Sequence, residues 1–152
     1  VEQLGGVDIL VNGAGLAEPF VLVGASGGGG LVVHYAGRYP DQVAGVVLLD
    51  VPAPTGDLDK EFPGAMGWRN PEHLDYVAAD RQLARHPPSL GTIPLRVVTA
   101  TDGQSNVKDQ SFWLDLSSRA EQTTLEGGHD LSSENPAGVV AEIQSTLDAI
   151  QG

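Results

Sequence analysis

The chain has 152 residues, of which 41% are hydrophobic and 18% are charged; this balance excludes a disordered chain and fits one domain, residues 1–152, with its own core. Eight basic residues against twenty acidic ones give a net charge of −12, and such a surface repels nucleic acid and anionic lipid, so neither is expected as a partner. The sequence has no cysteine, which excludes disulfides and thiolate metal sites. No segment reaches the ~18 apolar residues of a membrane span, and no secretion signal is recognisable, so we expect a cytoplasmic location.

Short apolar runs rich in β-branched residues recur along the chain and predict the strands of a sheet. They cover residues 7–11, 20–23, 43–49 and 95–99, with a weaker fifth run at 121–125. Near-continuous apolar runs are typical of strands that are buried on both faces of a parallel sheet.

Helical patterns lie between the predicted strands. They cover residues 31–38, 71–85, 107–116 and 136–150. Alternating strands and helices predict an α/β fold, with a mostly parallel sheet of about five strands flanked by helices.

The link between the first two predicted strands is too short for a parallel crossover. Residues 13–18 would have to span roughly 20 Å, which is close to the full reach of six extended residues. Parallel neighbours usually need a dozen or more connecting residues. We therefore expect the first strand either to pair antiparallel or to be exchanged with a second copy of the chain.

A glycine-rich segment, Gly24-Ala25-Ser26-Gly27-Gly28, follows the second predicted strand and fits the pattern G-x-S-x-G. In this pattern the serine sits on a strained turn, where side chains two residues away on either side would clash. The backbone N–H of Gly27 would then point at the oxygen that becomes negative during acyl transfer. The same segment also fits a loop that wraps a phosphate, so by itself it does not decide between the two chemistries.

Further motifs follow in a fixed order: RYPDQVAGVVLLD at 38–50, IPLRVVTA at 93–100 and LEGGHD at 125–130. With them, residues 19–150 resemble the second half of an α/β-hydrolase of the esterase and lipase type. The resemblance implies that Ser26 is the nucleophile and His129 the general base, in the chain order Ser, acid, His. It implies a small-molecule carboxylic ester or related acyl substrate, an acyl-enzyme intermediate, and no cofactor or metal.

The resemblance leaves three candidates for the acid of the triad. The family usually carries the acid after the strand that corresponds to residues 95–99, which favours Asp102. Asp109 lies at the start of the next predicted helix. Asp50 comes directly after the predicted strand 43–49. It matches a minority arrangement of the family, in which the acid follows the strand before the usual one.

The sequence departs from the family on its N-terminal side. About four strands normally precede the nucleophile strand in this family, and here there is one. That strand is followed by Asn12-Gly13-Ala14-Gly15, which is similar to the family's HGxG loop and makes the Ala14 N–H the second candidate oxyanion donor beside Gly27. Because a shortened sheet would have an uncovered edge, we expect a homodimer, with exchange of residues 1–17 as one way to form it.

A cap-like insertion is expected at about residues 52–90, which are rich in proline and glycine near their start. Long ordered connections often serve as lids or binding elements. Phe62, Met66 and Trp68 could line an apolar acyl pocket there, or could simply cover the core.

A dinucleotide-binding interpretation competes for the same glycine-rich loop. Residues 23–30 also resemble the TGxxxGxG loop of short-chain dehydrogenases, residues 1–17 resemble the NNAG segment of that family, and Asp50 could meet a ribose hydroxyl. Against this, the NNAG-like piece precedes the loop instead of following it, and no tyrosine is followed by lysine at the fourth position. A nucleotide-binding Rossmann-like module and an inactive hydrolase remnant stay as alternatives to the enzyme.

Overall fold

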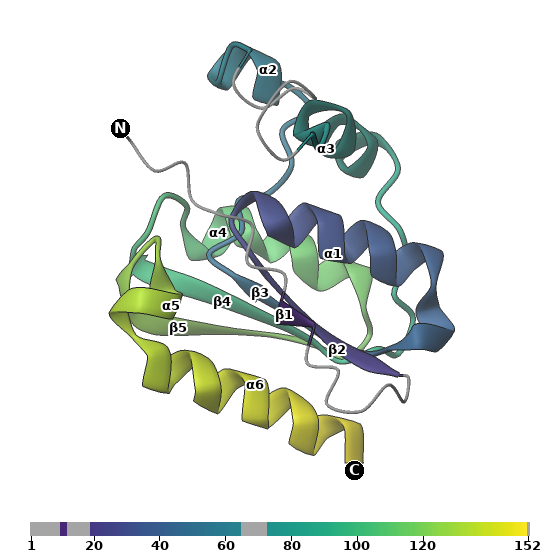
Figure 1. Cartoon of the computed structure of the whole chain (residues 1–152), viewed down its shortest axis with the longest axis vertical. Coiled ribbons are helices and arrows are strands. Elements are labelled where there is room, and N and C mark those ends of the chain that lie inside the picture. Colours follow the sequence, from purple (N-terminus) through teal and green to yellow (C-terminus); the bar gives the residue numbers. More distant parts are fainter. Residues whose placement is uncertain (1–9, 12–18, 65–72, 152) are drawn as a thin grey trace.

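A computed structural model of the chain describes residues 10–11, 19–64 and 73–151 (Figure 1). Its strands form one five-stranded sheet in the order β1-β2-β3-β4-β5. They are β1 (Leu10–Val11), β2 (Phe20–Ala25), β3 (Val43–Leu49), β4 (Leu95–Asp102) and β5 (Ala120–Gly128). β2 to β5 are parallel, which confirms the predicted α/β fold. β1 is antiparallel to β2, the first of the two arrangements expected for it.

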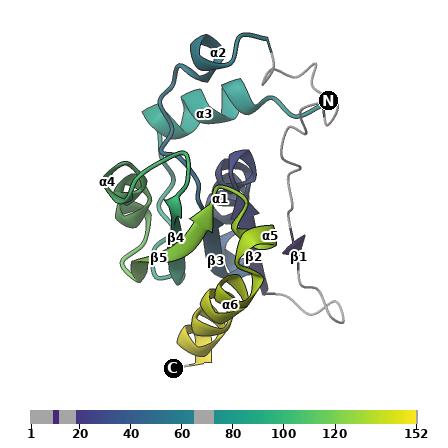
Figure 2. The ribbon, with the colours of Figure 1, turned by 90° about the vertical axis from the view of Figure 1, so that its left-hand side faces the viewer.

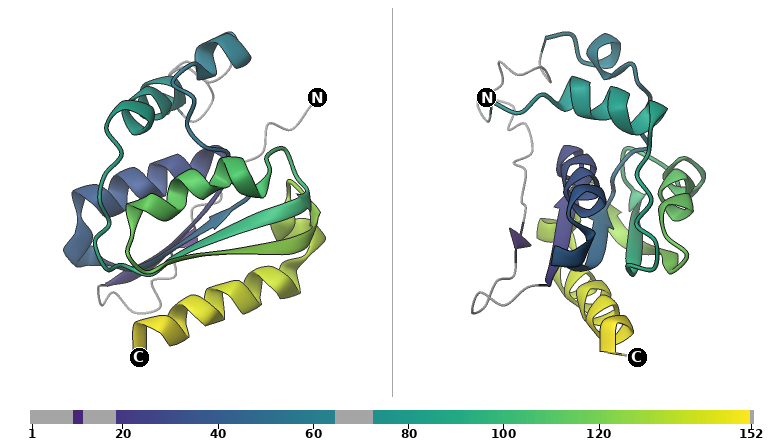
Figure 3. Two further views of the ribbon diagram at one scale, coloured as in Figure 1. Left: turned by 180° about the vertical axis from the view of Figure 1, so that it is seen from behind. Right: turned by 90° about the vertical axis from the view of Figure 1, so that its right-hand side faces the viewer.

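Helices cover both faces of the sheet (Figures 1 and 3). On one face lie α1 (Gly27–Arg38), α4 (Val107–Gln110) and the 3-10 helix η2 (Ser111–Leu116); on the other lies α6 (Pro136–Gln151). Successive strand residues point to opposite faces, so each strand supplies both halves of the core. Thus Leu48 packs in the cluster that holds Trp113 of η2, whereas its neighbour Leu49 packs in the cluster that holds Val139 of α6.

Several helix boundaries differ from the sequence prediction for identifiable reasons. α1 begins at Gly27 rather than at residue 31, so the glycines belong to its first turn. α3 (Tyr76–Arg85) begins where the side chain of Asp75 caps it by accepting a hydrogen bond from the N–H of Ala78 at 2.9 Å. The helix predicted over 107–116 is divided into α4 and η2.

The connection from β3 to β4 carries α2 (Leu58–Glu61) and α3, which lie beyond α1 on its side away from the sheet (Figures 1 and 2). The Asp80 carboxylate of α3 accepts hydrogen bonds from the backbone N–H groups of Thr55 and Gly56, at 3.0 and 2.7 Å. These bonds hold the first part of the connection against α3. None of the described helices is long and apolar enough to cross a membrane.

Candidate active site

Three side chains meet at the carboxyl ends of the parallel strands. Ser26 directly follows β2, Asp50 directly follows β3, and His129 directly follows β5. The hydroxyl oxygen of Ser26 lies 2.8 Å from Nε2 of His129, and Oδ2 of Asp50 lies 2.7 Å from Nδ1 of the same ring. A hydroxyl, an imidazole and a carboxylate joined in this order have the geometry of a nucleophile, its base and the group that orients the base.

Ser26 occupies a strained turn between β2 and α1. Its backbone has φ 49° and ψ −128°, a region that residues other than glycine rarely adopt. A Cβ on Gly24 would lie 2.8 Å from backbone atoms of Gly28 and Gly29, and one on Gly29 would lie 2.3 Å from Val51. The lack of a side chain at Gly24 and at Gly29 therefore lets β2, α1 and the residue after β3 approach closely enough to hold the serine at the tip of the turn. For Gly24 this is what the G-x-S-x-G pattern predicts.

Asp50 is fully buried and is held by four hydrogen bonds. Oδ1 accepts from the N–H of Ala100 at 3.2 Å and from Nε2 of Gln110 at 2.8 Å; Oδ2 accepts from the N–H of Gln104 at 3.2 Å and from His129. Burial by itself raises the pKa of this carboxyl, but the four hydrogen bonds together outweigh it and hold the pKa below its ordinary value. The carboxylate is thus kept charged behind the imidazole.

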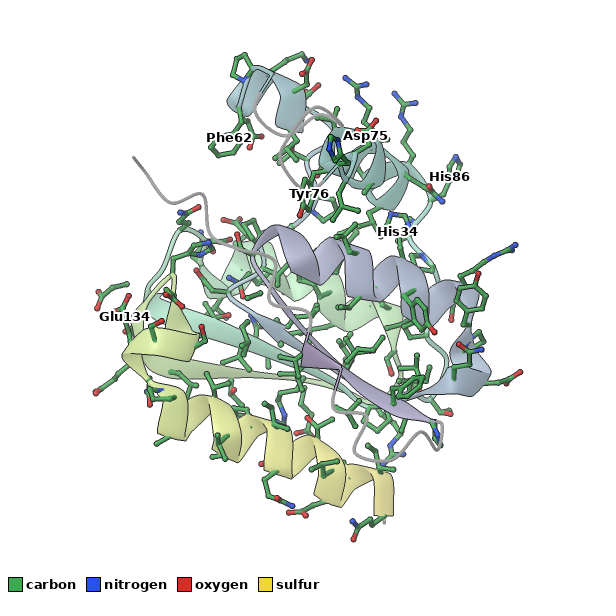
Figure 4. The ribbon with its side chains drawn as sticks, in the orientation of Figure 1. His34, Phe62, Asp75, Tyr76, His86 and Glu134 are labelled. Atoms are coloured by element: carbon green, nitrogen blue, oxygen red, sulfur yellow. The ribbon has the colours of Figure 1, made fainter. Side chains whose placement is uncertain are left out.

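The loop that carries His129 is fixed by its own neighbours. Gly127 has φ 139°, and the N–H of Gly128 donates to the Glu134 carboxylate at 2.8 Å; Figure 4 labels this glutamate at the end of the short helix α5 (Leu131–Glu134). Asp130 bonds locally to the backbone of Ser133 and to the hydroxyl of Ser132. The imidazole is 25% exposed, so a substrate can reach it from solvent.

The predicted acid, Asp102, does not contact His129, and the structure puts Asp50 in that position instead. β4 continues as far as Asp102, which pairs with Gly128 of β5 and is exposed, whereas β3 ends before Asp50. Asp50 then adopts φ 45°, which turns its side chain toward the histidine. Asp109, the other candidate, bonds to Asn106 at the start of α4.

The remaining predicted site residues are the two oxyanion donors. Gly27 is the first residue of α1, directly after Ser26, so its N–H belongs to the free N-terminal turn of that helix. Ala14 lies outside the described residues. Sequence reasoning missed Gln110, and also Gly103, where a Cβ would come within 2.3 Å of the Asp50 carboxylate. The Asp-Gly pair at 102–103 was the available signal for Gly103, whereas nothing in the sequence marked Gln110.

Comparison with known proteins identifies the family. A sequence model described as the alpha/beta hydrolase fold matches residues 14–124, and the chain therefore belongs to this family. This membership supports a hydrolase as the general class of protein. Comparison with curated proteins gave no significant match.

Solved structures with the same fold cover most of the chain. A thermophilic esterase from Thermogutta terrifontis is 22% identical with a TM-score of 0.64, and the match covers 93% of this chain and 69% of the esterase. Rv0554 from Mycobacterium tuberculosis is 14% identical with a TM-score of 0.65 over 87% of this chain and 66% of its own. A serine hydrolase involved in carbazole degradation is 17% identical with a TM-score of 0.56 over 85% and 63%. At these identities the likeness shows the fold, and the chain spans about two thirds of the length of these proteins.

Proposed function

We propose that the protein is a serine hydrolase that cleaves a small-molecule carboxylic ester, or a related acyl compound, through an acyl-enzyme. One observation carries the proposal: an unbroken chain of hydrogen bonds runs from the Ser26 hydroxyl through both nitrogens of His129 to the buried carboxylate of Asp50. Because the Asp50 carboxylate accepts the hydrogen bond that Nδ1–H of His129 donates, the other ring nitrogen, Nε2, carries no proton and can accept that of Ser26.

In the proposed reaction the Ser26 oxygen attacks the ester carbonyl while His129 Nε2 takes the hydroxyl proton. The imidazolium that forms is stabilised by the Asp50 carboxylate 2.7 Å away. The negative oxygen of the tetrahedral intermediate would accept from the N–H of Gly27 and, as a second donor, from that of Ala14. His129 then gives its proton to the leaving alcohol, and a water activated by the same nitrogen releases the acyl group from Ser26.

The segment from 52 to 90 is proposed as a cap-like insertion that bounds the substrate side. It leaves the sheet directly after Asp50, and its helices α2 and α3 lie beyond α1. Figure 4 labels Phe62 beside α2, and this residue is 47% exposed, so its side chain is available to contact an acyl chain. The two other predicted pocket residues, Met66 and Trp68, lie outside the described residues.

The nucleotide-binding alternative fits the geometry less well. Asp50, the residue that would meet a ribose hydroxyl, is fully buried and already bonded to His129. The glycines at 24 and 29 serve close packing against α1 and Val51. Both observations favour acyl transfer over phosphate binding for the Ser26 loop.

A serine-reactive fluorophosphonate probe, followed by intact-mass measurement, tests the proposal. We expect one label per chain in the wild type and none in Ser26→Ala. A labelled Ser26→Ala variant would place the reactive nucleophile elsewhere. An unlabelled wild type that melts at a higher temperature with NAD(P) would support the nucleotide-binding module, and one that neither labels nor shifts would support the inactive remnant.

A homodimer is proposed from the sheet edge at β1, the first strand of the sheet. Among the described residues, β1 pairs with Leu22 and Val23 of β2, and no further strand lies beyond β1. An edge strand of this kind can pair with a strand from a second copy of the chain, which would extend the sheet. Exchange of residues 1–17 between copies is one way to form that pairing.

A further inference from the structure

A buried chain of polar side chains lies behind Asp50, on the side away from His129. Gln110 is fully buried and donates from Nε2 to Oδ1 of Asp50 at 2.8 Å. Its Oε1 accepts from the hydroxyl of Thr99, also buried, at 2.9 Å. The Thr99 oxygen in turn accepts from Nε2 of Gln122 on β5 at 3.0 Å. Each of the four residues comes from a different element or strand end.

The direction of every bond in this chain follows from the carboxylate. An ionised Asp50 can only accept, so the amide of Gln110 must present its NH₂ group to it. The amide oxygen then faces Thr99, whose hydroxyl must donate, which leaves the lone pairs of that hydroxyl to accept from Gln122. Thr99 therefore supports the amide orientation that the carboxylate requires, because its hydroxyl accepts from Gln122 and has its proton left to donate to the amide oxygen. A rotated amide would put an oxygen against the carboxylate and repel it.

The carboxylate depends on these donors because it has little else to stabilise its charge. Among the described residues, His129 is the only ionisable partner of Asp50, and it is charged only when protonated. The other three bonds come from neutral groups, and the bond from Gln110 is the shortest of them. A buried charge without such donors would be strongly disfavoured.

We propose that Gln110 and Thr99 are positioning residues of the triad: Gln110 holds the Asp50 carboxylate in place behind His129, and Thr99 fixes the orientation of the Gln110 amide. This inference rests on the proposed hydrolase function. It concerns residues that do not touch the substrate and act on the reaction only through Asp50.

The test uses substitutions that keep shape and change one hydrogen-bonding group. Gln110→Met removes the donor, Thr99→Val removes the hydroxyl, and Thr99→Ser keeps the hydroxyl while losing a methyl group. Thr123→Val is the matched control, because it is the same change at a threonine whose buried hydroxyl has no hydrogen-bond partner among the described residues. For each variant we would measure kcat and KM with a p-nitrophenyl ester and the rate of fluorophosphonate labelling.

We expect kcat to fall about 10–100-fold in Gln110→Met and in Thr99→Val, with KM unchanged. This is the range typical of the loss of a hydrogen-bonding partner that orients a metal-binding side chain. Thr99→Ser and Thr123→Val should keep most of the wild-type kcat. Combining Gln110→Met with Thr99→Val should cost no more than Gln110→Met alone, because no amide is left to orient. Multiplying losses would mean that each residue acts independently, and the inference would be wrong.

The inference and the proposed function fail in different ways. A wild type without a label at Ser26 overturns the function. A labelled wild type with unchanged kcat in Gln110→Met or in Thr99→Val overturns only the positioning roles. If Gln110→Met does not fold, the order of Thr99→Ser and Thr99→Val in kcat decides: equal values refute the role of the hydroxyl.

Discussion

Replacing Asp50 with asparagine is the sharpest test of the site, because it changes the chemistry and keeps the backbone. Asp50 has φ 45°, and asparagine is one of the few residues that tolerates this conformation. The side chain keeps its size, so the site stays filled. What changes is that one of its two terminal atoms becomes a donor.

The hydrogen bonds around Asp50 determine which of the two oxygen positions, Oδ1 or Oδ2, the NH₂ group of the asparagine takes. With NH₂ in place of Oδ1, the amide would face two fixed donors, the N–H of Ala100 and the NH₂ group of Gln110. With NH₂ in place of Oδ2, it would face only one, the N–H of Gln104, together with His129, whose ring can change tautomer. The second arrangement is therefore favoured, and it forces Nδ1 of His129 to accept.

A histidine that accepts at Nδ1 carries its proton on Nε2, where it cannot take the proton of Ser26. We expect kcat to fall by about 10⁴-fold, the size of the effect when a triad aspartate is changed to asparagine. The lost carboxylate bonds should also lower the free energy of unfolding by about 1–3 kcal/mol. Ester hydrolysis and urea denaturation measure the two effects separately.

Asp102→Asn is the matched control, because Asp102 is exposed and no described residue bonds to its side chain. It should keep kcat within about two-fold of the wild type, in line with exposed substitutions. The reasoning is refuted if Asp50→Asn keeps more than a tenth of the activity, or if Asp102→Asn abolishes it.

Three other predictions concern the acid stability of the fold, the packing at Gly29 and the proposed dimer. The pKa of Asp50 is held below its ordinary value of 3.8, so the charged carboxylate stabilises the fold fully above pH 3.8, and this stabilisation is lost as the pH falls through the lowered pKa. Between about pH 5 and pH 2 the melting temperature of the wild type should therefore fall more than that of Asp50→Asn, which has no carboxyl at this position. Equal falls in the two melting temperatures would contradict this. Gly29→Ala should cost about 1–3 kcal/mol in urea denaturation, because its Cβ would lie 2.3 Å from Val51, whereas Gly30→Ala, at 3.2 Å from Leu83, should cost clearly less; equal costs would count against the packing argument. Sedimentation equilibrium should give a dimer at micromolar concentration, and a monomer mass throughout would refute the proposed pairing at the β1 edge of the sheet.

The sequence predicted the strands, and it singled out two of the three side chains that meet at the candidate site, because their signals are local. The apolar runs at 43–49 and 95–99 are strands in the structure, the second extended to Asp102. Ser26 is marked by glycines on both sides, and His129 by the Gly-Gly pair before it. Each of these signals lies within a few residues of the side chain that it marks.

The acid could not be chosen in this way, because its position depends on residues far away in the chain. In the sequence Asp50 and Asp102 both follow apolar runs, and nothing next to either one differs decisively. What separates them is Gln110, 60 residues after Asp50, the Ala100 N–H, and the absence of a Cβ at Gly103. These partners are brought to Asp50 only by the completed sheet.

The backbone of the site shows the same dependence on the whole fold. Among the described residues, only Ser26, Asp50 and His73 are non-glycine residues with positive φ, and two of them belong to the proposed triad. These two follow neighbouring strands, directly after the register pair Ala25 and Leu49, and each is anchored to the next strand: the N–H of Ser26 donates to Leu49 and that of Asp50 to Val98. Such a conformation costs of order 1–3 kcal/mol per residue and persists only where its surroundings impose it. The pairing of β2, β3 and β4 therefore holds Ser26 and Asp50 in the strained conformations that direct the hydroxyl and the carboxylate toward the His129 imidazole. A substitution that weakens the packing of β2 or β3 should then disturb the hydrogen bonds of the proposed triad, even where it replaces no residue of the triad.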